Sequence, residues 1–265
     1  GWDDFVIVDA RRKKITNPAH LAKKLCMRHF SVGADGLILV MASKKADYRM
    51  QIFNSDGSEA EMCGNGIRCF AKFLKEKAIT KKTKLTVETK AGLIKPELLD
   101  DVVKVDMGEP VLSRRHIPMI GDGEPAINEE LKLNGDSNVH VTAVSMGNPH
   151  AVVFVKELDT YPFEKIGREV EIHSAFPNKT NVEFVEIVNN KALEVKVWER
   201  GVGPTLACGT GACAAVVAAS LNGRTGRKVK VKLPGGILTI EWAEDDNHVY
   251  MTGPAETIFE GEVKV

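Results

Sequence analysis

The sequence predicts an α+β protein of two similar, pseudo-symmetric halves, each a mainly antiparallel β layer wrapped around one central helix. Two Cys-Gly-X-Gly motifs, at residues 63–66 and 208–211, each stand between a polar loop and an apolar run. Short strand-like segments bounded by turn residues surround both motifs. With 265 residues the chain is near the size limit of a single core, which favours two domains.

The two motifs belong to an internal repeat. Asn54 lies nine residues before Cys63, and Glu199 lies nine residues before Cys208. Further along, residues 86–110 resemble residues 231–254, and residues 3–8 are weakly echoed by residues 148–155. Two units related by a pseudo-two-fold axis would bring the two helix N-termini face to face.

The repeat predicts the domain boundaries. We expect residues 1–110 to form the N-terminal half, with residues 254–265 packing back on it, and residues 111–253 to form the C-terminal half.

The first half is predicted from its local signals. Asn17 and Pro18 are typical of a helix N-terminus, so a helix is expected over residues 17–26. A second helix follows Cys63 and ends near residue 77. Apolar or alternating runs predict strands over residues 5–9, 37–41 and 48–53, with two or three more before residue 105.

Residues 107–138 are rich in Pro, Gly and charge, and we expect them to be the linker and the opening of the second half. A short helix is expected over residues 163–169, and the Ala/Val run 212–219 indicates a buried helix. Strands are predicted over residues 139–144, 151–155, 181–187 and 192–198. With one long helix per half, the pattern does not suggest a parallel βαβ sheet.

Composition excludes several classes of function. The 36 basic and 36 acidic side chains balance, which gives no reason to expect a nucleic-acid or membrane partner. The longest apolar runs are far shorter than the roughly 20 residues of a spanning helix. Five cysteines are an odd number in a long chain, which argues against a disulfide framework and for a reducing compartment. We therefore expect a cytoplasmic protein.

Cys63 and Cys208 are the candidate reactive groups. Each would stand at a helix N-terminus, where unpaired backbone N–H groups and the helix dipole favour a thiolate and attract an anion. A buried structural cysteine is the alternative for any single residue, and packing inside the helices is expected for Cys69 and Cys213. No Cys-x-x-Cys or His-x-x-x-His spacing is present, so no metal site is predicted.

Two facing thiols suit acid–base chemistry on one carbon atom. Inversion of a stereocentre by proton transfer needs a base on one face and a conjugate acid on the other. A thiol with a pKa near 8.5, lowered by a helix N-terminus, would serve both roles. The amides of the first turn could hold a carboxylate and stabilise the charge that develops as the proton leaves.

The motifs Met-Cys-Gly-Asn-Gly-Ile-Arg-Cys at residues 62–69 and Leu-Ala-Cys-Gly-Thr-Gly-Ala at residues 206–212, with Glu-Arg-Gly at 199–201, closely resemble diaminopimelate epimerases. The resemblance covers essentially the whole chain. It implies a cofactor-independent enzyme that interconverts LL- and meso-2,6-diaminopimelate in lysine and cell-wall synthesis, and commonly a homodimer. It also implies a first strand that would precede Gly1.

The resemblance implies a role for each matching residue. Cys63 and Cys208 would be the catalytic acid–base pair, with His150 beside Cys63 and Glu199 beside Cys208. The amides of the first helical turns would hold the reacting carboxylate, and Asn and Arg side chains would bind the distal end of the substrate. The expected substrate-binding residues are Asp3, Asn54, Gly64, Asn65, Asn148, Asn181, Glu199, Arg200, Gly209 and Thr210.

One position departs from the family pattern. The family usually has Gly-Asn-Asp-Phe where this chain has Trp-Asp-Asp-Phe at residues 2–5, so a substrate-contacting Asn is replaced by Asp3. A further negative charge would weaken the binding of a substrate with two carboxylates unless Asp3 faces an amino group.

Two other functions stay open. A proline or hydroxyproline racemase is a related two-thiol enzyme, but that group typically has His where Asn65 stands and binds a substrate with one carboxylate. Asn65 and Arg200 argue against it. The third hypothesis is a non-catalytic binding or redox protein in which Cys63 and Cys208 form a switchable disulfide.

Overall fold

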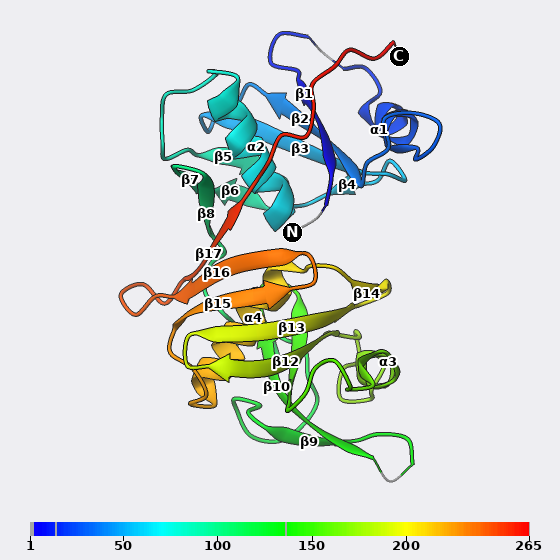
Figure 1. Cartoon of the computed structure of the whole chain (residues 1–265), viewed down its shortest axis with the longest axis vertical. Helices are drawn as coiled ribbons and strands as arrows, with labels where there is room; N and C mark the ends of the chain where they lie inside the picture. Colours follow the sequence, from blue (N-terminus) through cyan, green and yellow to red (C-terminus); the bar gives the residue numbers. More distant parts are fainter. Residues whose placement is uncertain (1–2, 14, 136, 265) are drawn as a thin grey trace. The chain divides into compact units, whose positions relative to one another are not determined.

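The computed structural model describes residues 3–13, 15–135 and 137–264. The chain divides into two compact units. The terminal unit contains the described residues up to Asp106 and those from Thr252 onward, and the central unit is Met107–Met251. Figure 1 shows the course of the chain through both.

The terminal unit is built on a six-stranded sheet with the order β1-β2-β3-β5-β6, in which β4 pairs with β3. Two helices and the hairpin β7–β8 complete the unit. The elements are β1 (Phe5–Asp9), α1 (Pro18–Cys26), β2 (Gly36–Met41), β3 (Tyr48–Asn54), β4 (Glu59–Ala60), α2 (Gly64–Glu76), β5 (Val87–Thr89), β6 (Gly92–Ile94), β7 (Pro96–Leu99) and β8 (Val102–Asp106).

The central unit has a larger sheet, in which the strands follow the order β16-β15-β13-β12-β11-β10-β9 and β14 pairs with β13. Its elements are β9 (Glu129–Lys132), β10 (Asn138–Ser145), β11 (Pro149–Val155), α3 (Phe163–Glu171), β12 (Asn181–Asn189), β13 (Ala192–Glu199), β14 (Gly203–Thr205), α4 (Gly209–Leu221), β15 (Lys228–Leu233) and β16 (Gly236–Trp242). Strand β17 (Val249–Pro254) leads the chain from the central to the terminal unit.

The internal repeat is present in the strand order of the two units. The path β1-β2-β3-β5-β6, with β4 on β3, corresponds to β11-β12-β13-β15-β16, with β14 on β13. The pair β3/β5 is parallel, as is β13/β15, and the preceding and following pairs match as well. Helices α2 and α4 occupy equivalent places in the two units, which confirms the predicted two-fold repetition.

Each unit nevertheless contains a parallel βαβ crossover, which the sequence pattern was wrongly expected to lack. Strands β1 and β2 are parallel with α1 between them, and β11 and β12 are parallel with α3 between them. A helical connection of this length lets the chain return and run in the same direction. Antiparallel pairs still outnumber parallel ones among the described strands, so the mainly antiparallel α+β class is confirmed.

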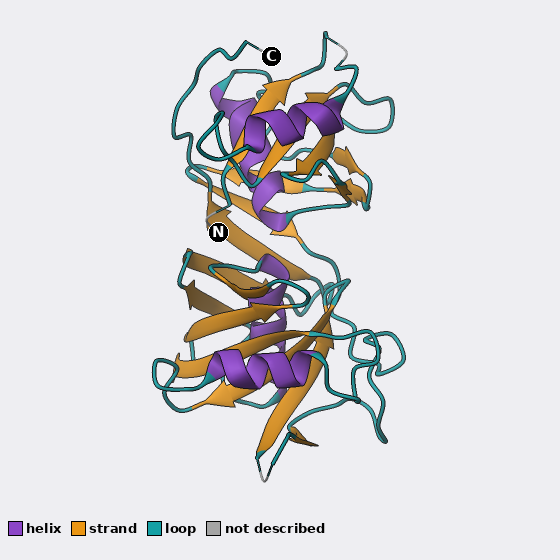
Figure 2. Ribbon diagram, turned by 90° about the vertical axis from the view of Figure 1, so that its right-hand side faces the viewer, coloured by secondary structure: helices purple, strands orange, loops and turns teal. Residues whose placement is uncertain are grey.

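The helices lie against the strands of their own unit (Figure 2). Helix α1 begins as predicted, because the Asn17 side chain accepts a hydrogen bond of 3.1 Å from His20 N. Helix α4 is buried along its length and contacts β10, β11, β12, β13, β15 and β16. Helix α2 is amphipathic, with charged residues on its outer face and a buried face against the sheet.

Two further segments complete the description of the fold. The expected linker 107–138 contains strand β9, which pairs with β10 and extends the central sheet. The C-terminal segment contacts α2 in the terminal unit, through Thr257 with Glu76 and through an ion pair between Lys77 and Glu260. No helix in the described part of the chain is both long and apolar enough to cross a bilayer.

Candidate active site

Cys63 is the N-cap residue of α2, as predicted. Its backbone is extended, with φ −140° and ψ 121°, and its Sγ accepts a hydrogen bond of 3.4 Å from Gly66 N. Gly66 faces the sheet closely, because a Cβ there would lie 3.1 Å from Ile52 Cδ1 and 3.2 Å from Ile38 Cδ1. The first amides of α2 have no carbonyl partner within the helix; that of Gly66 donates to the thiol, and amides in such a position can also bind an anion.

A chain of polar side chains leads from a buried arginine to the Cys63 thiol. Arg68, which is 1% exposed, donates to Asn65 Oδ1 at 2.8 Å. Asn65 Nδ2 in turn donates to Asp3 Oδ2 at 2.7 Å. The same carboxylate oxygen lies 3.9 Å from Cys63 Sγ. Asp3 therefore faces an amide and a thiol in this unit, and Arg68 holds Asn65 in place.

The pKa of Cys63 lies above its ordinary value, contrary to the sequence-based expectation for a helix N-terminus. Burial of the thiol raises this pKa to about 11, and the negative charge of Asp3 adds to the effect. Hydrogen bonds from the N–H groups of Gly66 and Asn65 and the charge of Arg68 act in the opposite direction. The cost of desolvating a thiolate outweighs the helix terminus here.

Cys208 occupies the same position on α4. It is the N-cap residue, with φ −128° and ψ 116°, and its Sγ accepts a hydrogen bond of 3.4 Å from Gly211 N. The Thr210 hydroxyl lies 3.3 Å from the sulfur. Burial of the thiol, together with the carboxylates of Glu199 and Glu183, raises the pKa of Cys208 to about 12. Here too, the predicted lowering of the thiol pKa was wrong.

His150 is fully buried on β11 and lies between two polar side chains. Its Nδ1 lies 2.7 Å from Glu183 Oε1, and its Nε2 lies 2.9 Å from Asn148 Oδ1. The parallel pairing of β11 with β12 places His150 opposite Asn181, two residues before Glu183. Cys63 belongs to the other unit, so the role of His150 beside Cys63 stays a prediction.

The remaining candidate site residues of the central unit make hydrogen bonds within the protein. Asn181 is 5% exposed; its Oδ1 accepts from Arg200 N at 2.9 Å and its Nδ2 donates to Pro149 O at 2.8 Å. The Arg200 guanidinium donates to Asn178 O at 3.2 Å. Glu199 ends strand β13 and accepts a hydrogen bond of 2.6 Å from the Thr205 hydroxyl. Asn181 thus anchors the backbone of the loop that carries Arg200.

In the terminal unit, Asn54 ends strand β3 just as Glu199 ends β13, which confirms their equivalence in the repeat. Asn54 is exposed, and its Nδ2 donates to Ser58 Oγ at 2.9 Å. Gly64 and Gly209 are the first residues of α2 and α4, followed by Asn65 and Thr210.

Sequence reasoning missed two residues near the thiols. Glu183 lies in the apolar run of β12, two positions after Asn181, and Arg68 lies three positions after Asn65 on α2. In both cases the sequence offered a signal. A charged residue stands in an otherwise apolar element, at a spacing that puts it on the same face as a candidate site residue.

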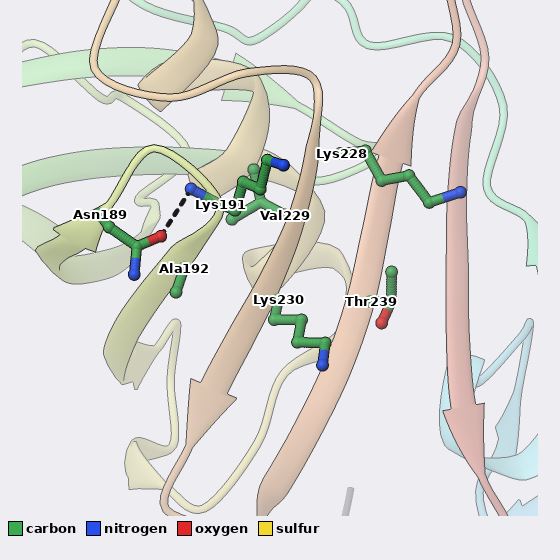
Figure 3. Close-up of a pocket in the computed structure, with 7 residues that line it drawn as sticks. All are labelled: Asn189, Lys191, Ala192, Lys228, Val229, Lys230 and Thr239. Atoms are coloured by element: carbon green, nitrogen blue, oxygen red, sulfur yellow. Dashed lines mark hydrogen bonds between the residues drawn. The ribbon is translucent and has the colours of Figure 1, made fainter.

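A surface cavity of about 510 Å³ lies elsewhere in the central unit and is lined by none of these residues (Figure 3). It lies beside the β12–β13 turn and strands β15 and β16, and its polar groups are mainly Lys191, Lys228 and Lys230. Among the residues that the structure describes, no three His, Cys, Asp or Glu side chains are grouped as a metal site requires.

The comparison with protein families identifies the family. The model of the family described as diaminopimelate epimerase matches residues 3–113 and 142–258, which include both cysteine motifs. The chain belongs to the diaminopimelate epimerase family. This membership confirms the resemblance inferred from the two motifs.

Close relatives match over almost their full length. The diaminopimelate epimerase of Methanococcus maripaludis strain C6 is 51% identical over 268 residues, covering 99% of this chain and 96% of the relative. That of Heliobacterium modesticaldum is 53% identical, covering 98% of this chain and 96% of the relative.

Solved structures share the fold at low identity. A PhzF-family phenazine biosynthesis protein of Bacillus anthracis matches with a TM-score of 0.70 and 20% identity, covering 98% of this chain and 93% of the other. A hydroxyproline epimerase of Agrobacterium vitis matches with a TM-score of 0.61 and 16% identity, covering 90% and 79%. These likenesses support the fold class alone.

Proposed function

We propose that this chain interconverts LL- and meso-2,6-diaminopimelate by proton transfer at one α-carbon. The observation that carries the proposal is the equivalence of Cys63 and Cys208: each caps the central helix of its unit, and each accepts a hydrogen bond from the amide three residues later. Relatives about half identical over nearly the full length, all named diaminopimelate epimerase, support this substrate.

In the proposed reaction, one thiolate removes the α-proton and the thiol of the other cysteine delivers a proton to the opposite face. The carbanion that forms between the two steps is adjacent to the substrate carboxylate. That carboxylate is held by the first-turn amides of Gly64 and Asn65 and of Gly209 and Thr210, which also stabilise the developing charge. The two thiols supply both proton transfers, so no cofactor is required.

Substrate binding and thiol ionisation are coupled in this proposal. Both thiols are protonated in the free protein at neutral pH, because burial raises the pKa of Cys63 to about 11 and that of Cys208 to about 12. The substrate brings an α-ammonium group, and a positive charge close to a thiol favours its thiolate. The base would therefore form when the substrate is bound.

The distal end of the substrate is recognised by the polar residues that match the family motif. Arg200 offers a guanidinium to the distal carboxylate, and the amides of Asn54 and Asn148 offer donors and acceptors. Asn181 contributes by fixing the backbone of Arg200. Glu199 acts beside Cys208, where its carboxylate raises the pKa of the thiol. Asp3 fits a substrate amino group better than a carboxylate, because its charge repels anions.

The proposal is tested by following LL-diaminopimelate by proton NMR under reducing conditions, with the wild type and with Cys63→Ser and Cys208→Ser. A serine hydroxyl is a far weaker acid than a thiol, so each variant should lose roughly 10²–10⁴-fold in rate, the usual contribution of general acid–base catalysis. Cys69→Ser, a half-buried cysteine inside α2, is the matched control and should turn over like the wild type.

Two outcomes would contradict the proposal. Near-normal turnover in either of the first two variants would remove the two-thiol mechanism. Turnover of proline but not of diaminopimelate by the wild type would favour the hypothesis of a proline racemase.

We further propose that the protein is a homodimer of the cytoplasm. The family resemblance supports the dimer, and the five free cysteines support a reducing compartment. Light scattering during size-exclusion chromatography would decide the first point, because the chain alone has a mass of 29.0 kDa.

A further inference from the structure

Glu183 is a buried carboxylate to which the proposed reaction assigns no role. It lies on β12, and its side chain is 0% exposed. Its Oε1 lies 2.7 Å from His150 Nδ1, whereas its Oε2 has no hydrogen-bond partner in the described part of the chain. Burial of a carboxylate that is only partly satisfied is unfavourable, so a placement of this kind points to a function.

The carboxylate lies against the helix that carries Cys208. A Cβ at Gly211 would lie 2.6 Å from Glu183 Oε1, so only a glycine leaves room for the carboxylate at this turn. Gly211 is three residues after Cys208, in the first turn of α4. The N-terminal end of a helix carries partial positive charge, which stabilises a carboxylate placed there. Glu183 therefore connects His150 with the Cys208 helix.

The same contact fixes the hydrogen position on the His150 ring. With Glu183 ionised, as its place against the positive end of α4 favours, the carboxylate only accepts hydrogen bonds, and the hydrogen is then on Nδ1. If Asn148 presents its oxygen to Nε2, the ring is an imidazolium; if the amide is turned over, the ring is neutral and Nε2 accepts. Nδ1 keeps its hydrogen in both arrangements, and Nε2 is always the nitrogen that faces Asn148.

We propose that Glu183 is a positioning residue of the epimerase site: from its place against the first turn of α4 it keeps hydrogen on His150 Nδ1 and holds the other ring nitrogen toward Asn148. This proposal rests on the proposed function, which places His150 and Asn148 in the substrate site. The charge of Glu183 has a second effect, because together with Glu199 on β13 it opposes ionisation of Cys208, whereas the Thr210 hydroxyl favours it.

The variant Glu183→Gln tests the proposal, because it keeps the size of the side chain and removes its charge. We expect kcat to fall about tenfold or more, with little change in KM. This is the usual size of effect when a hydrogen-bond partner that orients a functional side chain is removed. Alkylation of Cys208, followed by peptide mass spectrometry, should shift to lower pH. Glu186→Gln is the matched control, since Glu186 lies on the same strand and accepts a hydrogen bond from Leu158 N.

A wild-type kcat together with an unchanged alkylation profile in Glu183→Gln would overturn the proposal. A second measurement needs neither a variant nor turnover. In ¹⁵N-labelled wild type, the fully buried His150 ring should be protected from exchange, and we expect its Nδ1 to be protonated. A ring with hydrogen on Nε2 alone would overturn the proposal whether or not the protein acts on diaminopimelate.

Discussion

The helices that follow Cys63 and Cys208 share a backbone design but differ in the charges around the thiol. Cys63 faces one carboxylate, Asp3, which is balanced by the chain through Asn65 to Arg68. Cys208 faces two carboxylates and a hydroxyl. The pKa of Cys63 is raised to about 11 and that of Cys208 to about 12. A repeated fold has thus produced two unequal acids, which suits a reaction whose two faces carry different stereoisomers.

The two helices also differ in how much of their surface is buried. All nine residues from Gly211 to Ala219 of α4 are buried, whereas α2 buries one face and exposes charged residues on the other. The surroundings of Cys208 are therefore fixed by a densely packed core, and those of Cys63 by a network of polar side chains.

The comparison predicts that the two helices respond unequally to one added methyl group. Gly211→Ala would force a Cβ to within 2.6 Å of Glu183 Oε1, a buried atom held by His150. We expect a loss of about 2 kcal/mol in the free energy of unfolding, in the range of overpacked cores. Urea denaturation measures this difference.

Gly66→Ala is the matched change in α2. Its Cβ would contact the methyl ends of Ile52 and Ile38 at 3.1 and 3.2 Å, which can shift by a few tenths of an ångström. The higher helix propensity of Ala, about 1 kcal/mol, offsets part of the cost. Equal losses of unfolding free energy in the two variants would show that the packing around Glu183 is no tighter than that around Gly66.

A smaller effect is expected from the charge beside Cys63. Asp3→Asn removes a negative charge 3.9 Å from the thiol, and the interaction of two charges at this distance is about 1 kcal/mol in water. The pKa of Cys63 should fall, and its alkylation at pH 9 should become about fivefold faster. Iodoacetamide labelling with peptide mass spectrometry measures the rate.

Asp4→Asn is the control for this prediction. Asp4 is the next residue and is paired with Arg28, whereas the Cys63 thiol lies beside the carboxylate of Asp3. A similar acceleration in both variants would mean that net charge, and not the Asp3 contact, sets the reactivity of Cys63.

Much of this arrangement could be predicted from local rules. Cys-Gly-X-Gly before an apolar run identified two helix N-caps, because a capping residue and its neighbours are adjacent in sequence. The repeat spacing identified Asn54 and Glu199 as equivalent positions of the two halves. These predictions depend on residues only a few positions apart.

The contacts made by tertiary structure could not be predicted in this way. His150 and Glu183 are 33 residues apart, and they meet only because β11 and β12 are parallel and in a particular register. The direction of the thiol pKa shifts was wrong for the same reason: the helix terminus is a local feature, whereas burial of Cys63 and Cys208 depends on the folded unit. Parallel pairing itself was missed because α1 and α3 are short.

The most direct test of the two-thiol account is a brief incubation of the wild type with LL-diaminopimelate in D₂O, stopped after a few per cent of turnover. Each thiol carries one exchangeable proton, so the acid on the product side should deliver deuterium. We predict meso product with deuterium at the inverted α-carbon and remaining LL substrate that still carries its α-proton. Product that keeps the original α-proton would show that one base moves the same proton between faces, and would contradict the account.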